Sequence, residues 1–184
     1  NVLGVFPGTG IGGGIIIGGK LYYGASGNAG EVGHMIIQTD GPLCNCGQYG
    51  CLEALASRTS IAKDSLALAG VGKAPYTYSK AGTDIKNYKS SVFEKAFKKN
   101  EETVMKVVNR AAHFLGIGLA NCVNILNPDI IIIGGGLIER LGETYLRIVE
   151  RSMREHAMQA LQKDVHIAQA ALGDDAVIIG AAGL

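Results

Sequence analysis

Four potential metal ligands lie within eighteen residues in the first third of the chain. One histidine and three cysteines make up the set: His34, Cys44, Cys46 and Cys51. Imidazole and thiolate are the ligands that Zn²⁺ takes in tetrahedral protein sites, and four protein ligands leave no position for a catalytic water. The pattern therefore predicts a structural zinc ion that pins a long loop.

A set of unpaired thiols beside an unrelated histidine is the alternative. The glycines between the cysteines favour the metal, because a tight metal-binding turn needs backbone conformations that glycine adopts easily. The fourth cysteine, Cys122, stands apart on an apolar helical stretch. Such a position is typical of a small core residue, so Cys122 is not expected to bind metal.

A glycine-rich segment over residues 8–14 is a candidate phosphate-binding loop. It follows a strand-like run and offers backbone N–H groups and one hydroxyl at Gly8, Thr9 and Gly10. It is neither a Walker loop, since no Gly-Lys-Ser/Thr follows, nor a dinucleotide fingerprint, since no helix begins after it. A tight glycine-rich hairpin without a ligand is the alternative.

A second glycine segment consists of Gly134, Gly135 and Gly136. It stops a β-branched run, and α/β folds bind their ligands at the carboxyl ends of strands. The same three glycines would also allow close packing after a buried strand. Residue types alone leave both interpretations open.

Hydrophobic periodicity predicts the elements that position these residues. Apolar runs predict strands at 2–6, 14–17, 20–23, 129–133 and 165–168. Helical spacing predicts helices at 51–70, 101–126 and 137–162, and a further helix after Asp174 and Asp175. The second of these helices has one apolar face, made of Val104, Val107, Val108, Ala111, Leu115 and Leu119. Residues 24–50 and 72–87 are predicted to be loops.

Length and composition restrict the class of protein. The 184 residues are 47% hydrophobic and 18% charged, which suits one α/β domain with a buried core. A formal net charge of +1 provides no basic surface for nucleic acid or an anionic membrane. No apolar run reaches the roughly 18 residues that cross a bilayer, and the first residues of the sequence do not resemble a basic n-region with a cleavage site, so a cytoplasmic protein is expected. A strand at the first residue indicates a missing N-terminal half.

These motifs, in this order, resemble the ROK family, named for repressor, open reading frame and kinase. Besides residues 8–14, the resemblance rests on Glu31-Val32-Gly33-His34 and on Cys44-x-Cys46-Gly47-x-x-Gly50-Cys51-x-Glu53. It continues through Asn127-Pro128-Asp129 into the second glycine segment, and then through Leu172-Gly173-Asp174-Asp175-Ala176 to Gly180-Ala181-Ala182. It covers nearly the whole chain.

The resemblance implies a fold and a place within that fold. The fold is an actin-like, hexokinase-type (ribonuclease H-like) ATPase, in which two α/β lobes close over ATP and sugar. Residues 1–184 would form the C-terminal lobe, with a zinc-pinned sugar loop at about 24–53. The family's catalytic aspartate belongs to an N-terminal lobe outside these residues. No catalytic residue is therefore expected here, and this lobe alone should be inactive.

The resemblance also implies which residues bind ligands. Glu31, His34 and Glu53 would bind sugar hydroxyls, and carboxylates suit this role because each accepts hydrogen bonds from two hydroxyls. One ring nitrogen of His34 would bind zinc while the other faces the sugar. Residues 8–10 would hold the phosphates of ATP with Mg²⁺, and residues 134–136 would lie near the nucleoside. Ordinary surface acids are the alternative for both glutamates.

The function implied is ATP-dependent phosphorylation of a hexose, with glucose as the expected substrate and a homo-oligomer as the expected assembly. N-acetylmannosamine and N-acetylglucosamine kinases share the metal and carboxylate pattern. A sugar-responsive transcriptional repressor is the alternative from another class, since family repressors carry a helix-turn-helix upstream of this same lobe. A zinc-stabilised interaction domain would explain the cysteines but not Glu31, Glu53 or the glycine-rich loop.

Overall fold

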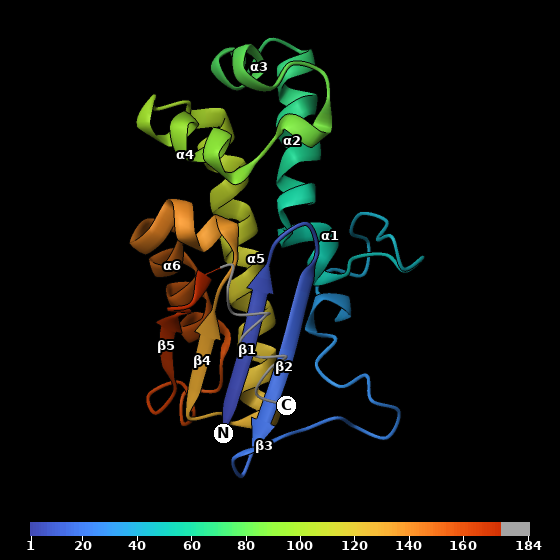
Figure 1. Cartoon of the computed structure of the whole chain (residues 1–184), viewed down its shortest axis with the longest axis vertical. Coiled ribbons are helices and arrows are strands. Elements are labelled where there is room, and N and C mark those ends of the chain that lie inside the picture. Colours follow the sequence, from blue (N-terminus) through green and yellow to red (C-terminus); the bar gives the residue numbers. More distant parts are fainter. Residues whose placement is uncertain (174–184) are drawn as a thin grey trace.

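A mixed five-stranded sheet forms the centre of the molecule. The computed structural model describes residues 1–173, and the strand order of its sheet is β3-β2-β1-β4-β5 (Figure 1). The strands are β1 (Val2–Pro7), β2 (Ile11–Ile17), β3 (Lys20–Leu21), β4 (Ile130–Ile133) and β5 (His166–Gln169). The first three strands pair antiparallel, whereas β4 runs parallel to both β1 and β5. The predicted α/β class is confirmed.

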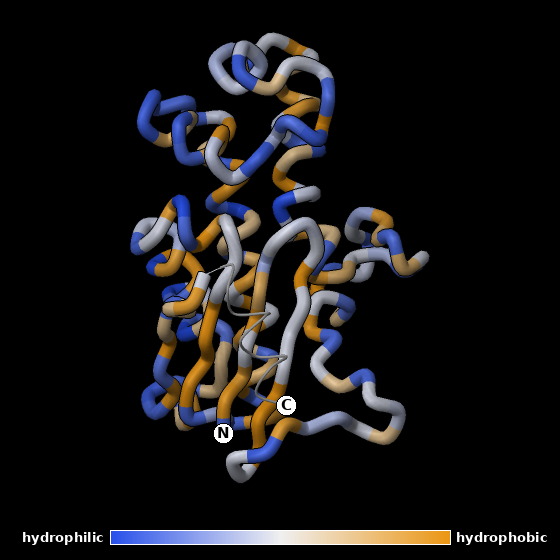
Figure 2. The backbone as a smooth tube through the Cα atoms, in the orientation of Figure 1, coloured by the Kyte–Doolittle hydropathy of each residue, from blue (hydrophilic) through white to orange (hydrophobic). Residues whose placement is uncertain are grey.

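The two central strands are buried by apolar side chains on one face. Leu3 and Val5 in β1 lie opposite Ile131 and Ile133 in β4, and none of the four has exposed surface. They belong to one core with the helices α5 (Glu102–Leu126) and α6 (Gly136–His156), which Figure 1 shows behind the sheet. In Figure 2 the most hydrophobic parts of the chain run along these strands. Burial of this face is the main stabilising contribution to the sheet.

The longest helix, α5, follows the predicted periodicity. Its expected apolar face is buried at every position: Val104, Val107, Val108, Ala111, Leu115 and Leu119. The same helix packs closely against α6 at Gly116, where a Cβ would lie 2.5 Å from the carbonyl oxygen of Val149 and 2.5 Å from the Cβ of Ser152. A residue without a side chain therefore lets the two helices approach.

The remaining helices follow the β1–β2 hairpin in the chain. They are η1 (Val32–His34), α1 (Leu52–Ala56), α2 (Arg58–Gly70), α3 (Pro75–Ala81), η2 (Ile85–Asn87) and α4 (Ser90–Lys98). Figure 1 shows α2, α3 and α4 beyond the end of the sheet toward which β1 points. The start of α2 consequently lies next to the tip of the hairpin, where Arg58 donates its backbone N–H to the carbonyl oxygen of Gly8 at 2.9 Å.

Several predicted boundaries were wrong. The expected helix at 51–70 is two helices, because Ser57 is extended and its hydroxyl caps α2 by accepting the Ser60 N–H at 3.1 Å. The helix expected to reach Gln162 ends at His156, and β3 ends at Leu21 instead of residue 23. A hydrogen bond from the Met158 N–H to the side chain of Asn124, at 2.8 Å, ties down the chain beyond α6.

The loop predicted at 72–87 was also wrong, because it contains α3 and η2. The carboxylate of Glu101 accepts the Tyr76 N–H at 2.8 Å and the Thr77 N–H at 3.1 Å. These two donors lie in the first turn of α3, which no neighbouring side chain caps. The cap comes from a residue more than twenty positions away, so local sequence did not reveal the helix.

The last expected helix, after Asp174 and Asp175, lies outside the described residues. Within residues 1–173, none of the helices combines the length and the apolar character needed to span a membrane.

Candidate metal and ligand site

The loop over residues 24–50 lies directly against the β1–β2 hairpin. A Cβ on Gly30 would lie 2.8 Å from the carbonyl oxygen of Gly13, and a Cβ on Gly33 would lie 2.2 Å from that of Ile11. Both contacts are too close for any residue with a side chain. The glycines of this loop therefore bring the predicted ligands against the hairpin.

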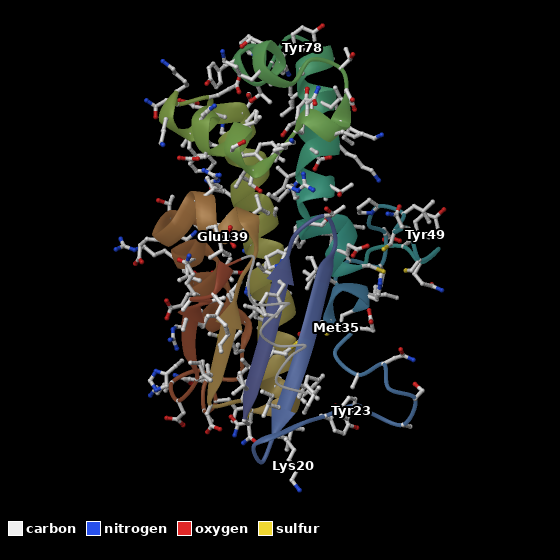
Figure 3. All side chains as sticks on the ribbon, in the orientation of Figure 1. Lys20, Tyr23, Met35, Tyr49, Tyr78 and Glu139 are labelled. Carbon is white, nitrogen blue, oxygen red and sulfur yellow. The ribbon has the colours of Figure 1, made fainter. Side chains whose placement is uncertain are left out.

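The structure brings the four predicted metal ligands together. One ligand atom from each of His34, Cys44, Cys46 and Cys51 lies within 4.8 Å of the other three. The Sγ atoms of Cys46 and Cys51 are 3.6 Å apart, and the Sγ of Cys44 is 3.8 Å from Nδ1 of His34. Ligands about 2.3 Å from a tetrahedral ion are roughly 3.8 Å apart, so the spacing suits Zn²⁺. Figure 3 shows sulfur atoms of this loop near the labelled Tyr49.

Burial opposes the ionisation of two of the three thiols. Removal from water raises the pKa of Cys44, and it raises the pKa of Cys51 to about 12. Cys46 is exposed, and a hydrogen bond from the backbone of Gln48 lowers its pKa. Metal ions bind cysteine as the thiolate, so a divalent cation would offset the cost of ionising the buried pair.

Of the three residues predicted to bind sugar, His34 belongs to the cluster itself, and Glu31 and Glu53 contact the cluster at two different residues. Glu31 Oε2 lies 3.8 Å from Nε2 of His34, whose other ring nitrogen faces Cys44. Glu53 Oε1 lies 3.7 Å from the Sγ of Cys44, and Glu53 Oε2 accepts the Ile11 N–H at 3.0 Å. Glu31 and His34 are therefore neighbours, whereas the carboxylate of Glu53 is turned toward the hairpin.

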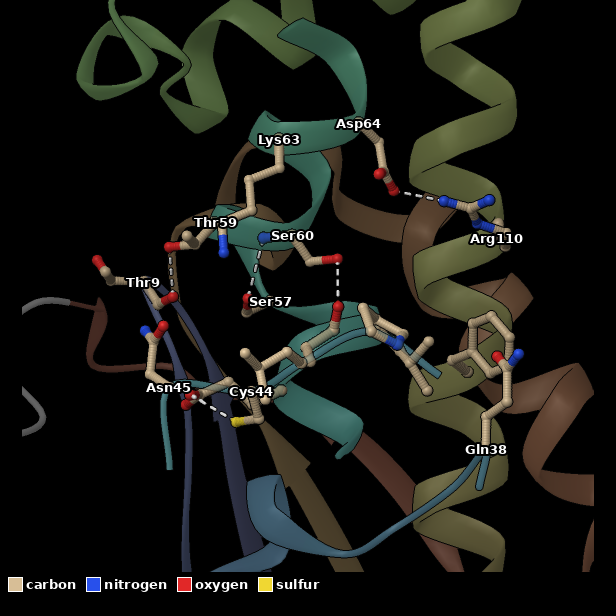
Figure 4. A pocket seen from close by; sticks show the side chains of 16 residues that line it. Thr9, Gln38, Cys44, Asn45, Ser57, Thr59, Ser60, Lys63, Asp64 and Arg110 are labelled. Carbon is tan, nitrogen blue, oxygen red and sulfur yellow. Dashed lines mark hydrogen bonds and ion pairs between the residues drawn. The ribbon is translucent and has the colours of Figure 1, made fainter. Parts of the chain in front are cut away.

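A pocket of about 510 Å³ opens beside Glu53 (Figure 4). It lies between the loop at 24–50, which we call the metal-binding loop, the first turns of α2 and the helix α5. Thr9, Cys44 and Glu53 line it, but Glu31 and His34 do not. Of the residues predicted to bind phosphate, only Thr9 lines this pocket, and of those predicted to bind sugar, only Glu53 does.

Three charged residues of this pocket were not predicted from the sequence. Lys63 and Asp64 from α2 and Arg110 from α5 line the pocket, and Asp64 forms an ion pair with Arg110. Thr59 and Lys63 are one turn apart in α2 and therefore lie on the same face of the helix. The helical spacing of the sequence could have predicted that these two side chains are neighbours. The ion pair between α2 and α5 spans 46 positions and has no local signal.

Thr9 stands at the tip of the hairpin and is held by the start of α2. Arg58 Nη2 donates to Thr9 Oγ1 at 2.7 Å, and Thr59 Oγ1 donates to the carbonyl oxygen of Thr9 at 2.6 Å. The turn is shorter than predicted, because β2 begins at Ile11. Arg58 was also missed. Its guanidinium adds a cation to a turn that was expected to offer only N–H groups and a hydroxyl.

The second glycine segment meets the first at one edge of the sheet. Because β1 and β4 are parallel, both segments follow the carboxyl end of a strand. Gly134 donates its N–H to the carbonyl oxygen of Val5 at 3.0 Å, and a Cβ on Gly135 would lie 2.6 Å from that of Pro7. Gly135 has φ of +94°, and α6 begins at Gly136. The helical segment 136–141, which the non-helical backbone of Gly142 separates from the rest of α6, therefore begins beside the hairpin.

A mixed sheet with two glycine turns at one edge, covered by helices and flanked by a Cys₃His cluster, defines a lobe of the actin-like ATPase fold. The chain belongs to the ROK family, whose model matches residues 1–184.

Curated relatives in this family include kinases and repressors. The chain is 35% identical to a glucokinase of Halalkalibacterium halodurans over 98% of this chain and 54% of that protein. It is 36% identical to an N-acetylmannosamine kinase of Vibrio cholerae over 95% of this chain and 53% of that protein. It is 35% identical to a putative xylose repressor of a Caldicellulosiruptor species, over 98% of this chain and 44% of that protein. The chain thus spans about half the length of these relatives.

A solved structure shares the fold closely. The ROK family glucokinase from Streptomyces griseus, crystallised with glucose and AMPPNP, superposes with a TM-score of 0.87 at 30% identity. The match covers 99% of this chain and 59% of that one.

Proposed function

We propose that this chain is the ATP- and sugar-binding lobe of a kinase that transfers the γ-phosphoryl group of ATP to a hexose, with glucose as the substrate. One observation carries the proposal. The side chain of Glu53 lies between Cys44 of the metal cluster and Ile11 of the glycine hairpin, so carboxylate acceptors and a phosphate-type turn adjoin. The S. griseus glucokinase, crystallised with glucose and AMPPNP, supports the assignment of both ligands.

Zinc would be held by His34, Cys44, Cys46 and Cys51. The ion supplies charge that stabilises the thiolates and fixes the loop against the hairpin. Once the loop is fixed, Glu31 and the Nε2 of His34 are oriented together, 3.8 Å apart, on the side of the imidazole away from Cys44. A carboxylate and an imidazole nitrogen in this arrangement bind adjacent hydroxyls of a sugar.

The phosphates of ATP would bind at the hairpin turn. Phosphoryl transfer depends mainly on positioning and on neutralising charge, and Mg²⁺ would bridge the phosphates. Thr9 offers a hydroxyl, Arg58 offers a guanidinium 2.7 Å from it, and the first turn of α6 offers free N–H groups nearby. The nucleoside would then lie near Gly134 to Gly136. The general base would come from the other lobe.

The alternative functions differ in which ligands they need. A sugar-responsive repressor must bind sugar but has no use for a nucleotide, so the ordered turn at Thr9 and the start of α6 favour the kinase. An N-acetylmannosamine or N-acetylglucosamine kinase uses the same parts and differs only in the sugar. The proposal of glucose rests on likeness to the glucokinases at 35% and 30% identity.

The test is ATP turnover by the intact protein, with metal analysis of the same preparation. We expect about one zinc per chain and ADP formation with glucose that exceeds the rates with N-acetylmannosamine and xylose. Faster turnover with N-acetylmannosamine would replace glucose by an N-acylhexosamine. Tight sugar binding in calorimetry without any ADP formation would overturn the kinase in favour of the repressor.

A further inference from the structure

The carboxylate of Glu53 connects two regions that are distant in sequence. Oε2 accepts the backbone N–H of Ile11 at 3.0 Å, and Oε1 contacts the Sγ of Cys44 at 3.7 Å. Ile11 is the first residue of β2, directly after the phosphate-type turn. Oε2 is thus engaged by the hairpin, whereas Oε1 lies beside a residue of the predicted metal cluster without a donor once Cys44 binds metal as the thiolate.

The local fold explains why Glu53 reaches the hairpin. Cys51, Leu52 and Glu53 are consecutive, and together they form the cap and first turn of α1. Leu52 is fully buried against α5, where a Cβ on Gly118 would lie 2.5 Å from its Cδ2. Cys51 joins the metal cluster. With these two residues anchored, a short rigid turn fixes where the third side chain points.

The hairpin is shaped to receive this carboxylate. A Cβ on Gly10 would lie 2.2 Å from Glu53 Oε2, so the contact requires glycine at that position. On its other side, the carbonyl oxygen of Ile11 lies against Gly33 of the metal-binding loop. The backbone of Ile11 is therefore held on one side by Gly33 of the metal-binding loop and on the other by Glu53 in the first turn of α1.

We propose that Glu53 is a positioning residue that couples the metal-binding loop to the phosphate-type hairpin. Through it, ordering of the loop is transmitted to the Ile11 amide and hence to the turn at Thr9. The kinetic consequence rests on the proposed function, because it concerns ATP. The structural coupling does not, because it concerns only the mobility of the hairpin.

The decisive measurement is hydrogen exchange at the Ile11 amide in the intact, zinc-loaded protein, followed by NMR. Glu53→Ala removes the side-chain acceptor of the Ile11 N–H, and loss of such a hydrogen bond corresponds to a change of about tenfold or more in the exchange rate. We expect the Ile11 amide to exchange faster by that factor while zinc content stays at the wild-type level. Asp40→Asn, which removes an exposed carboxylate from the same loop, is the matched control and should leave Ile11 unchanged.

A double-mutant cycle sharpens the test. Gly10 does not have positive φ, so Gly10→Ala is tolerated by the backbone, and its new Cβ should displace the flexible end of Glu53. We expect Gly10→Ala alone to accelerate Ile11 exchange about as much as Glu53→Ala. In the Glu53→Ala background the same substitution should add little. Additive effects, or an unchanged Ile11 amide in Glu53→Ala, would overturn the coupling.

ATP kinetics separates this inference from the proposed function. If the protein is a kinase and the coupling holds, Gly10→Ala should raise the KM for ATP about tenfold and leave the zinc content unchanged. Accelerated exchange in a protein that turns over no ATP would support the coupling and overturn the kinase. ATP turnover by the wild-type protein, together with an unchanged Ile11 exchange rate in Glu53→Ala, would support the kinase and overturn the coupling.

Discussion

Two regions of the molecule are stabilised in different ways. One is the sheet together with α5 and α6, and the other is the metal-binding loop. In the first region, large apolar side chains such as Leu3, Ile131 and Leu115 are completely buried. In the loop at 24–50, four residues are buried, and three of them are glycine or cysteine: Val32, Gly33, Cys44 and Gly50. The loop therefore has too little apolar surface to hold its shape by burial, and depends on close backbone contacts and on its ligands.

This difference predicts that the two regions fail separately. Damage to the sheet should unfold the whole molecule, because its core is continuous with both long helices. Damage to the loop should abolish the ligand site and leave the sheet folded. Four substitutions, taken in order of their expected effect on folding, test this contrast.

The largest effect is expected for Ile131→Ala in β4. Ile131 has no exposed surface, so the substitution leaves a cavity beside β1 and should lower the free energy of unfolding by about 2–5 kcal/mol. Urea denaturation followed by circular dichroism measures the loss. Zinc content of the folded fraction should not change. A variant that stays folded but loses zinc would contradict the separation of the two regions.

Overpacking the helix crossing should come next. Gly116→Ala places a Cβ 2.5 Å from both Val149 and Ser152 on α6, which should cost about 1–3 kcal/mol of the free energy of unfolding. The matched control is Gly70→Ala at the end of α2, where a Cβ meets nothing within 4 Å. This control should be neutral or stabilise by up to about 1 kcal/mol. Thermal melting of both variants gives the comparison.

Loss of a metal ligand should change the loop more than the fold. Structural zinc sites contribute about 10–16 kcal/mol over four ligands, so Cys46→Ser should weaken zinc binding at least about a hundredfold. The urea midpoint of Cys46→Ser should fall less than that of Ile131→Ala. Limited proteolysis of Cys46→Ser should cut the chain within residues 24–50. Glu53→Ala should bind sugar weakly but retain zinc. Equal loss of zinc in Cys46→Ser and Glu53→Ala would contradict the assignment of Cys46 as a metal ligand and of Glu53 as a carboxylate that does not bind the metal.

The smallest effect is expected for an exposed ion pair. Arg147 and Glu143 lie one turn apart on α6, 2.9 Å between Nε and Oε1, and both are largely exposed. Such pairs contribute about 0.3–0.5 kcal/mol, so Arg147→Ala should shift the melting temperature barely beyond error. A loss comparable with that of Gly116→Ala would show that surface charge, and not only burial, stabilises the helical layer.

Much of the fold was predictable because its signals are local. Four consecutive isoleucines at 130–133 favour a strand in any buried setting, and the apolar face of α5 repeats with the period of a helix. α3 was missed for the opposite reason. Its first turn is capped by Glu101, so the residues that stabilise the helix lie outside the window in which a pattern is visible.

The candidate site divides in the same way. The four predicted metal ligands lie close in sequence, and the types and spacing of such residues already favour a tetrahedral metal site. The contacts of Arg58 with Thr9 and of Asp64 with Arg110 join elements that are more than forty positions apart. Residue types alone do not indicate which charged side chains on a helix will meet a particular turn.

The sequence by itself determined the metal quartet, the two glycine turns and the alternation of strands and helices, because each depends on neighbouring residues and on intrinsic backbone preferences. Only the tertiary structure decided that both turns share one edge and that Glu53 faces Ile11 instead of open solvent. Those outcomes depend on how β1, β4 and α1 pack against α5. That packing is a global balance of buried surface, which no local segment contains.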